Sequence, residues 1–171
     1  MKEWDKIAIQ HGGYRRAIWP RVKKFLAKES ILDLGCGNAS YLRKKDVGID
    51  SSFEMCRLAK EHCKSICADA VFLPIKANSF SKVLSVATIH HLRSKKARIK
   101  FLKESKRVGK EILITAWYKR SFRKNIYKKW GSAKRFYHLF SKRELSRLAS
   151  LVFDKYEIYI SDKNLYLSAS A

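Results

Sequence analysis

The segment Asp33-Leu-Gly-Cys-Gly-Asn38, which directly follows the apolar pair Ile31-Leu32, constrains this chain more than any other stretch. Two glycines after a buried strand allow a sharp backbone turn and let a ligand lie against bare amides. A second acid, Asp50, comes seventeen residues after Asp33, at a place where a carboxylate can accept hydrogen bonds from ribose hydroxyls. The pattern predicts a nucleotide-type cofactor site at the end of a strand.

The charge of this site favours S-adenosylmethionine over a dinucleotide. The segment lacks the third glycine of the dinucleotide fingerprint, and Asp33 within the turn would repel a diphosphate. S-adenosylmethionine has a positive sulfonium, a positive amino group and a neutral ribose, so carboxylates complement it. A lone G-x-G can be an ordinary tight turn, but here three acids at the ends of successive predicted strands converge on one crevice. The residues predicted to bind the cofactor are Asp33, Gly35, Gly37, Asp50 and Asp69.

Strand-like and helix-like segments alternate along the chain. The predicted strands cover residues 31–34, 47–50, 65–68, 82–87 and 111–117, followed by a terminal hairpin of residues 153–160 and 164–168. The predicted helices cover residues 18–26 and 94–106, and two more begin at the capping boxes Ser51-x-x-Glu54 and Ser141-x-x-Glu144. This alternation predicts a doubly wound α/β fold, and 171 residues suit a single domain over residues 1–171.

The composition of the chain limits the kinds of partner that it is expected to bind. Lys and Arg number 38 against 15 Asp and Glu, and the formal net charge of +23 favours a polyanion such as nucleic acid over a small-molecule substrate. An acidic membrane surface or a simple gain in solubility is the alternative interpretation of this charge.

No run of about eighteen apolar residues is present, so we expect a cytoplasmic protein without a membrane span. The four cysteines form no C-x-x-C pair, so we expect free thiols and no metal site.

Two further segments carry candidate functional groups. Ala87-Thr-Ile-His-His91 ends the fourth predicted strand, which borders the transferred methyl group in this architecture, and His90 is the preferred candidate. The alternative is that one of the two histidines packs or caps the next helix. Residues 119–135 hold eight cations and no acid, and we interpret them as a surface excursion. Their interleaved aromatic rings favour RNA over a plain solvated face.

Several segments together resemble one family, the methyltransferases that esterify the carboxymethyl group of the wobble uridine in tRNA. The segments that carry the resemblance are Trp4-Asp-Lys-Ile-Ala8, Tyr14-Arg-Arg-Ala-Ile-Trp-Pro20, the cofactor loop from Asp33 to Leu42, Asp69-Ala70 with Leu73-Pro74, the I-H-H-L signature within Val86 to Leu92, Trp117, and Arg135-Phe-Tyr-His-Leu-Phe140 before Glu144-Leu145. The last of these is rare outside the family, and the joint occurrence of the peripheral segments selects this branch among methyltransferases.

The resemblance implies a class I methyltransferase (Rossmann-like) fold, with a seven-stranded, mostly parallel sheet and helices on both faces. It implies S-adenosylmethionine as the methyl donor, tRNA as the substrate and a small zinc-ribbon activator protein as the partner in a heterodimer. Ala70 joins the predicted cofactor site beside the acid on the adenine side. At the acceptor we expect Arg15 and Arg135 to hold the carboxymethyl group or a neighbouring phosphate, His90 and Tyr137 to shape the pocket, and Trp117 to offer a stacking surface.

The chain departs from this family at Ala39 and Ser40, where the family has Gly and Lys, and in a shortened segment after the fifth predicted strand. These departures keep two alternatives open. One is a class I methyltransferase that acts on another RNA position or on a protein, and the other is a catalytically inactive RNA-binding scaffold subunit. The retained glycines and acids favour an active enzyme, and cofactor binding would distinguish it from the scaffold.

Overall fold

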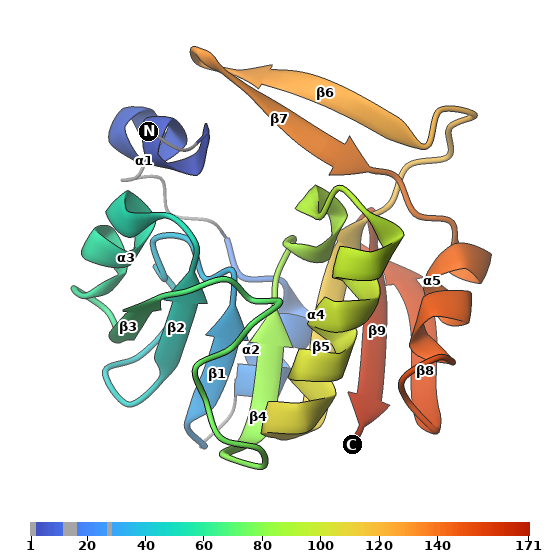
Figure 1. Ribbon diagram of the computed structural model, residues 1–171, viewed down its shortest axis with the longest axis horizontal. Helices are drawn as coiled ribbons and strands as arrows, with labels where there is room; N and C mark the ends of the chain where they lie inside the picture. Colours follow the sequence, from blue (N-terminus) through green and yellow to red (C-terminus); the bar gives the residue numbers. More distant parts are fainter. Residues whose placement is uncertain (1–2, 12–16, 27–28) are drawn as a thin grey trace.

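The computed structural model describes residues 3–11, 17–26 and 29–171, and its centre is a seven-stranded sheet (Figure 1). The strands are β1 (Ile31–Leu34), β2 (Val47–Asp50), β3 (Lys64–Cys67), β4 (Phe80–Ser85), β5 (Gly109–Trp117), β8 (Lys155–Ser161) and β9 (Asn164–Ser170). They lie in the order β3-β2-β1-β4-β5-β9-β8. β9 is antiparallel to both of its neighbours, whereas the other paired strands are parallel. The predicted seven-stranded, mostly parallel sheet is confirmed.

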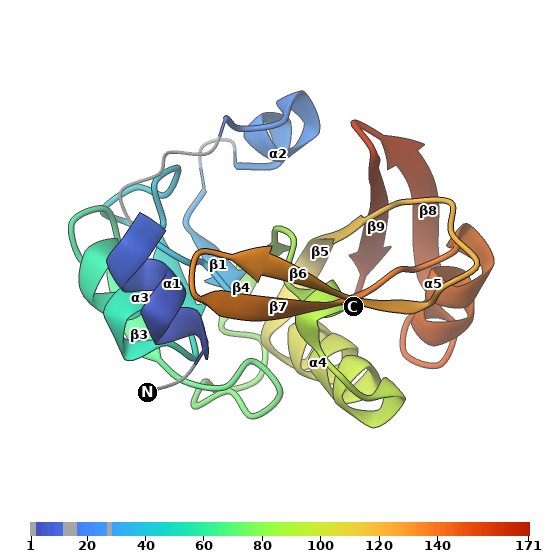
Figure 2. The ribbon, with the colours of Figure 1, turned by 90° about the horizontal axis from the view of Figure 1, so that it is seen from above.

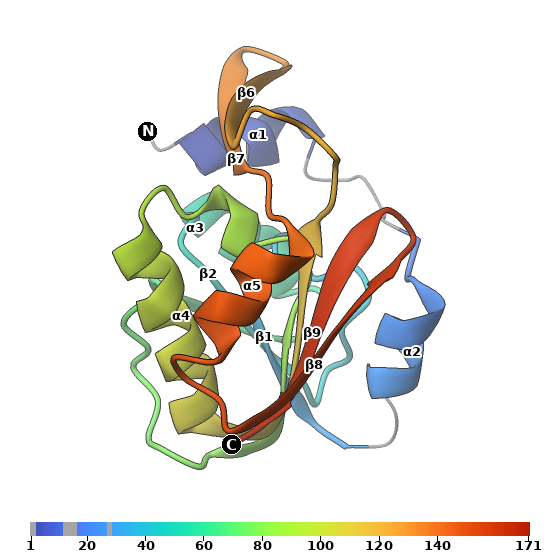
Figure 3. The ribbon, with the colours of Figure 1, turned by 90° about the vertical axis from the view of Figure 1, so that its right-hand side faces the viewer.

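Helices cover both faces of this sheet, as the side view in Figure 3 shows for α2 (Pro20–Leu26) on one face and for α4 (Lys95–Val108) and α5 (Lys142–Ala149) on the other. One buried apolar cluster joins α4 and α5 to the sheet through Phe101 and Leu145. A second cluster joins α2 and α3 (Phe53–Ala59) to the sheet through Val22 and Ala59. The core therefore lies in two layers, one on each face. Within the described residues, no helix has both the length and the apolar character needed to cross a bilayer.

The sequence explains where α4 begins and which face it buries. Ser94 is its N-cap, because the Ser94 hydroxyl accepts a hydrogen bond of 3.1 Å from the Ala97 amide. Phe101, Leu102 and Val108 recur at helical spacing and are buried. The predicted helix over residues 94–106 is confirmed to within two residues.

The helix α3 begins one residue later than the predicted capping box implies. The cap is Ser52, whose hydroxyl accepts from the Met55 amide at 3.2 Å, so the prediction that Ser51 caps this helix is wrong. Ser52 is held in this place because its own amide donates to Asp50 at 2.9 Å and its hydroxyl donates to Asp5 at 2.6 Å. Tertiary contacts thus select between two adjacent serines that are equally good caps in the sequence.

At the predicted box before α5, Ser141 does cap the helix, accepting from the Glu144 amide at 3.1 Å.

A two-stranded antiparallel hairpin crosses above the carboxyl edge of the main sheet (Figure 2). Its strands are β6 (Asn125–Trp130) and β7 (Ala133–His138), and we call them the β6–β7 hairpin. Residues 119–135 are mostly exposed, which agrees with the predicted surface excursion, and the regular pairing of β6 with β7 is a feature that the sequence pattern does not indicate. The hairpin is anchored at its base because the His138 imidazole contacts Asn125 at 2.7 Å and Glu144 at 2.7 Å.

The terminal hairpin is confirmed. β8 and β9 pair from Lys155 with Ser170 to Ser161 with Asn164. Asp162 and Lys163 form the two-residue connection and both have positive φ, at 51° and 59°. This conformation matches the twist of the flanking strands and explains the short turn.

Candidate active site

A cavity of about 240 Å³ lies at the carboxyl ends of β1 to β4, where open α/β sheets bind their ligands. We call it the cofactor cavity. Its floor comes from the turns after these strands, and its roof comes from α1 (Glu3–His11) and the β6–β7 hairpin. Figure 1 shows both roof elements above the strand ends. Trp4 and Ile7 of α1 and Trp130 and Arg135 of the hairpin line it from that side.

The two glycines of the turn after β1 have different tasks. Both have positive φ, 75° at Gly35 and 57° at Gly37. A Cβ on Gly35 would lie 2.8 Å from Cβ of Thr88, so this glycine permits close packing of the turn against the segment after β4. A Cβ on Gly37 would meet nothing within 4 Å and would project into open space. Both glycines line the cofactor cavity, and at Gly37 the bare backbone leaves room for a ligand.

Asp50 lies at the end of β2 and fixes the glycine turn. Its carboxylate accepts from the Gly37 amide at 2.9 Å through Oδ2 and from the Ser52 amide at 2.9 Å through Oδ1. Burial raises the pKa of the Asp50 carboxyl, and these amide hydrogen bonds partly offset that rise. Asp50 also lines the cavity, so its remaining acceptor capacity faces the space where ribose hydroxyls are expected.

The other two predicted acids lie in different settings. Asp33 is fully buried in β1, accepts from the Tyr41 hydroxyl at 2.7 Å and is not among the residues that line the cavity, whereas Tyr41 is. Asp69 lies in the exposed loop after β3 and lines the cavity together with Ala70. One Asp69 oxygen accepts from the Val71 amide at 3.0 Å, which fixes the first turn of this loop.

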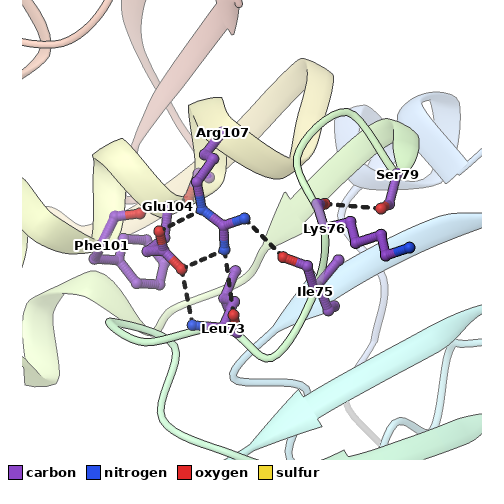
Figure 4. Close-up of polar contacts among 8 residues, drawn as sticks. Leu73, Ile75, Lys76, Ser79, Phe101, Glu104 and Arg107 are labelled. Atoms are coloured by element: carbon purple, nitrogen blue, oxygen red, sulfur yellow. Dashed lines mark hydrogen bonds and ion pairs between the residues drawn. The ribbon is translucent and has the colours of Figure 1, made fainter.

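The loop that carries Asp69 is fastened to α4 by hydrogen bonds from its backbone to an ion pair on that helix (Figure 4). Arg107 and Glu104 approach to 2.6 Å between Nε and Oε1. The same guanidinium donates to the Ile75 carbonyl at 2.6 Å, and Glu104 accepts from the Leu73 amide at 2.8 Å. The hydrogen bonds from Arg107 hold the pKa of the Glu104 carboxyl below its usual range, although partial burial opposes this. The side of the cavity that is lined by Asp69 and Ala70 is thus fixed through contacts of its loop with α4.

A second cavity, of about 250 Å³, adjoins the first. We call it the acceptor cavity. Ala87, His91, Trp130 and Arg135 line both cavities and form the boundary between them. The other residues of the acceptor cavity are Trp19, His90, Trp117, Lys128, Tyr137 and Asn164. Three of the residues predicted for the acceptor from the sequence, His90, Trp117 and Tyr137, are brought together here, and Arg135 lies at the boundary.

The two histidines have distinct hydrogen-bonding states. Nδ1 of buried His90 accepts from the Trp117 amide at 3.0 Å, so a neutral His90 carries its proton on Nε2. His90 also stacks on Tyr137, with ring centroids 5.4 Å apart and planes inclined by 13°. Nδ1 of His91 lies 2.7 Å from the Phe136 carbonyl and must donate to it, which leaves Nε2 of His91 as an acceptor. The first histidine lines the acceptor cavity, and the second lies where the two cavities meet.

Arg135 is held by aromatic faces as well as by His91. Its guanidinium carbon lies 4.5 Å from the ring centroid of Trp4, 5.0 Å from that of Trp130 and 5.5 Å from that of Tyr137. A terminal nitrogen also lies 3.3 Å from Nε2 of His91. Contacts of this kind fix the planar guanidinium at the boundary of the cavities.

The sequence indicates the helix α1 as part of the site only through the family resemblance of this segment. Trp4 packs edge-on against His91 at 4.7 Å between ring centroids. Gln10 donates to the Ser132 hydroxyl at 3.0 Å in the turn of the β6–β7 hairpin. α1 therefore joins the floor of the site to the hairpin that covers it. Nothing in the helical periodicity of this segment predicts these contacts, because their partners lie far away in the sequence, in the segment after β4 and in the turn of the hairpin.

Two further sequence observations concern this site. Arg15 lies outside the described residues. Ala39, where the related family has glycine, has a φ of 53° and is fully buried. This conformation costs an alanine about 1–2 kcal/mol, which explains the preference for glycine.

Residues 32–112 match a protein family described as a methyltransferase domain. A tRNA (carboxymethyluridine(34)-5-O)-methyltransferase of Arabidopsis thaliana is 32% identical over 139 residues, which are 74% of this chain and 34% of the relative. The protein of the same name from Schizosaccharomyces pombe is 29% identical over 125 residues, 67% of this chain and 55% of the relative. A probable tRNA methyltransferase 9B of Homo sapiens is 30% identical over 126 residues, 67% of this chain and 28% of the relative. The chain thus spans 28% to 55% of the length of these curated relatives.

Solved structures show the same fold. An S-adenosylmethionine-dependent methyltransferase from Methanosarcina mazei matches with a TM-score of 0.73 at 17% identity, covering 90% of this chain and 98% of that one. The CcbJ methyltransferase of Streptomyces caelestis matches with a TM-score of 0.75 at 12% identity, covering 99% and 98%. The match to the methyltransferase-domain family supports S-adenosylmethionine as the cofactor. Together with the strand order, these comparisons show a class I methyltransferase fold and a similarity to tRNA carboxymethyluridine methyltransferases.

Proposed function

We propose that this chain transfers a methyl group from S-adenosylmethionine to the carboxylate of a carboxymethyluridine at the wobble position of tRNA, which gives the methyl ester. The observation that carries the proposal is the acceptor cavity, because it combines aromatic rings that suit an unstacked base with cations that suit an acid. Among the described residues that line this cavity, none is an Asp or a Glu. The curated relatives named for this reaction support the same acceptor.

The cofactor cavity suits S-adenosylmethionine on its own geometry. The open backbone at Gly37 leaves space for the ligand, Asp50 offers acceptors to the ribose hydroxyls, and Asp69 with Ala70 borders the adenine. Asp33 acts from below the turn, through Tyr41. When bound, the cofactor supplies an electrophilic methyl group on its sulfonium.

The residues of the chain then have to position an acceptor that is already reactive. A carboxylate is anionic at neutral pH, so its attack on a methyl group needs no general base. Arg135 holds the carboxylate at the boundary of the cavities, while the Nε2 proton of His90 and the Tyr137 ring shape the pocket around the base. Arg15 is assigned to the carboxymethyl group or a neighbouring phosphate. The products are the ester and S-adenosylhomocysteine, and no proton is released.

A heterodimer with a small zinc-ribbon activator completes the proposal. It rests on the family resemblance and on the exposed apolar side chains Phe53, Phe72 and Leu151, each more than half exposed. Monomeric proteins carry single exposed apolar residues without a partner, so the sequence resemblance is the stronger of the two supports.

The test is methyl transfer from labelled S-adenosylmethionine to bulk tRNA from cells that lack this activity, with and without the activator, followed by nucleoside analysis. We expect a base-labile methyl ester on the wobble carboxymethyluridine. A base-stable methyl group at another position would keep the fold and the cofactor but overturn the acceptor. RNA binding without any transfer and without cofactor binding would identify a scaffold subunit instead.

A further inference from the structure

The β6–β7 hairpin places two cations directly opposite each other. Its register pairs Lys128 with Arg135, and the same register pairs Ile126 with Tyr137 and Trp130 with Ala133. Because side chains alternate along a strand, these pairs share one face of the hairpin. Directly opposed like charges in an antiparallel pair are destabilising, so their position on the face that lines the acceptor cavity calls for a compensating anion.

The other face of the hairpin carries a second pair of opposed cations, with which the first pair can be compared. Lys129 is paired with Lys134 there, and both are exposed and do not line either cavity. Water screens this outer pair. Lys128 is exposed as well, but together with the half-buried Arg135 it lines a cavity walled by aromatic rings. The two pairs therefore have the same charge and the same strands but different surroundings.

The ammonium group of Lys128 has a defined place in the acceptor cavity. Its Nζ lies 4.4 Å from the ring centroid of Trp117, at the end of β5. The edge of that same ring meets Tyr137, with centroids 5.3 Å apart. A cation thus lies over the Trp117 ring, and this contact holds Lys128 at the wall of the acceptor cavity, on the strand that is paired with the strand of Arg135.

We propose that Lys128 is a specificity-determining residue, which with Arg135 forms a two-cation clamp that selects an acceptor carboxylate over the corresponding neutral amide. This inference rests on the proposed function, since it concerns the same acceptor. An amide is neutral and presents one acceptor oxygen beside an NH₂ group, so it leaves the positive charge of the two cations uncompensated, whereas a carboxylate compensates it. Methyl transfer also removes the charge of the acceptor, so the clamp weakens on the product and favours its release.

The test compares two RNAs of identical sequence, an anticodon stem-loop that carries carboxymethyluridine and one that carries its carbamoylmethyl amide at the same position. Their dissociation constants are measured with the full chain saturated with S-adenosylhomocysteine, together with its activator if the wild-type assay needs one. We expect wild type to prefer the acid by about tenfold or more. Lys128→Met should reduce this ratio at least about fivefold, Lys128→Arg should preserve it, and Lys129→Met should leave it unchanged.

The ratio separates a specific contact from a general loss of charge. Each Met substitution removes one positive charge from the same strand, and the loss of phosphate attraction affects both RNAs equally. A wild-type ratio in Lys128→Met, or an equal fall in Lys129→Met, would overturn the clamp. Lack of any preference in a wild type that forms the methyl ester would also overturn it. Failure of wild type to form the ester overturns the proposed function instead, so the two failures are distinguishable.

Discussion

A terminal nitrogen of Arg135 lies 3.3 Å from Nε2 of His91, at the boundary where the cofactor and acceptor cavities meet. His91 presents this nitrogen as an acceptor because its other nitrogen donates to the Phe136 carbonyl of the β6–β7 hairpin. The imidazole therefore orients the guanidinium, and the hairpin orients the imidazole. Catalysis by positioning depends on chains of contact like this one.

Arg135→Ala should lower kcat/KM for carboxymethyl-bearing tRNA at least tenfold, equivalent to about 1.4 kcal/mol or more of transition-state stabilisation. Affinity for S-adenosylmethionine should fall much less, although Arg135 also lines the cofactor cavity. His91→Phe keeps a ring in place but removes the acceptor, so we expect a loss in kcat that is smaller than that of Arg135→Ala. Arg93→Ala is the charge-matched control, because Arg93 is exposed and lines neither cavity. Equal turnover in Arg135→Ala and in Arg93→Ala would remove Arg135 from the site.

Asp50→Ala should weaken S-adenosylmethionine binding at least about tenfold, measured by calorimetric titration. The substitution removes the acceptors for the ribose and also leaves the Gly37 amide without its 2.9 Å partner. Glu54→Ala removes the same charge from the next helix, where its carboxylate pairs with Arg57 at the surface, and should leave binding intact. Unaltered cofactor affinity in Asp50→Ala would exclude the ribose role.

A matched pair of glycine substitutions should separate stability from cofactor binding. Gly35→Ala adds overlap with Thr88 to the cost of a positive φ, so the free energy of unfolding should fall by about 2–4 kcal/mol. Gly37→Ala carries only the conformational cost, about 1–2 kcal/mol, but projects a methyl group into the open space beside the ligand. Chemical denaturation and cofactor titration of both variants check this. The reverse order of stabilities would contradict the assignment of the two glycines.

The Glu104–Arg107 ion pair should make part of the stability depend on pH. The pKa of Glu104 is lowered in the folded protein, so its contribution is present above the unfolded pKa of about 4.3 and is lost as the pH falls through the lower, folded value. Glu104→Gln should cost about 1 kcal/mol at pH 7, since Arg107 is partly exposed and the pair is partly screened. Wild type and variant should therefore differ in the free energy of unfolding at pH 7, and this difference should disappear as the pH falls through the folded pKa of Glu104. A constant difference across this range would contradict the ion-pair explanation.

Among the four cysteines, only Cys67 should react quickly with a thiol reagent under native conditions. Cys36, Cys56 and Cys63 are buried, and burial raises the thiol pKa to about 11 for Cys56 and Cys63 and well above the usual value for Cys36. Mass spectrometry after brief maleimide labelling should find one adduct per chain, and Cys67→Ser should remove it. Two or more rapid adducts would show that at least one of the three buried cysteines becomes accessible in the native protein.

The sequence predicts those parts of the fold that depend on local patterns. Short apolar runs that end in an acid or a glycine, such as residues 31–34 and 47–50, coincide with β1 and β2. The fourth predicted strand, residues 82–87, is displaced by two residues from β4, because the first three positions of β4, residues 80–82, are not fully buried and include a serine and a lysine that interrupt the apolar run. The composition of a segment thus predicts that it forms a strand, whereas its pairing with neighbouring strands determines at which residues the strand begins and ends.

The β6–β7 hairpin could not be predicted from the same signals. β6 is mostly exposed, and its inward positions include Lys128, so neither alternation nor β-propensity stands out. Its pairing is fixed by distant contacts, such as Gln10 with Ser132 and His138 with Glu144. The same reason explains why the sequence indicates His90, Trp117, Arg135 and Tyr137 as site residues but does not show that they surround one cavity.

Four residues, Ala87, His91, Trp130 and Arg135, belong to both cavities, and this shared wall has a thermodynamic consequence. A ligand that orders the wall from one side lowers the ordering cost for the ligand on the other side. By linkage, whatever factor cofactor binding adds to RNA affinity, RNA binding adds to cofactor affinity. In the proposed reaction the ester product is neutral and would lose its attraction to the cations of the acceptor cavity, so this coupling would then weaken the binding of both products.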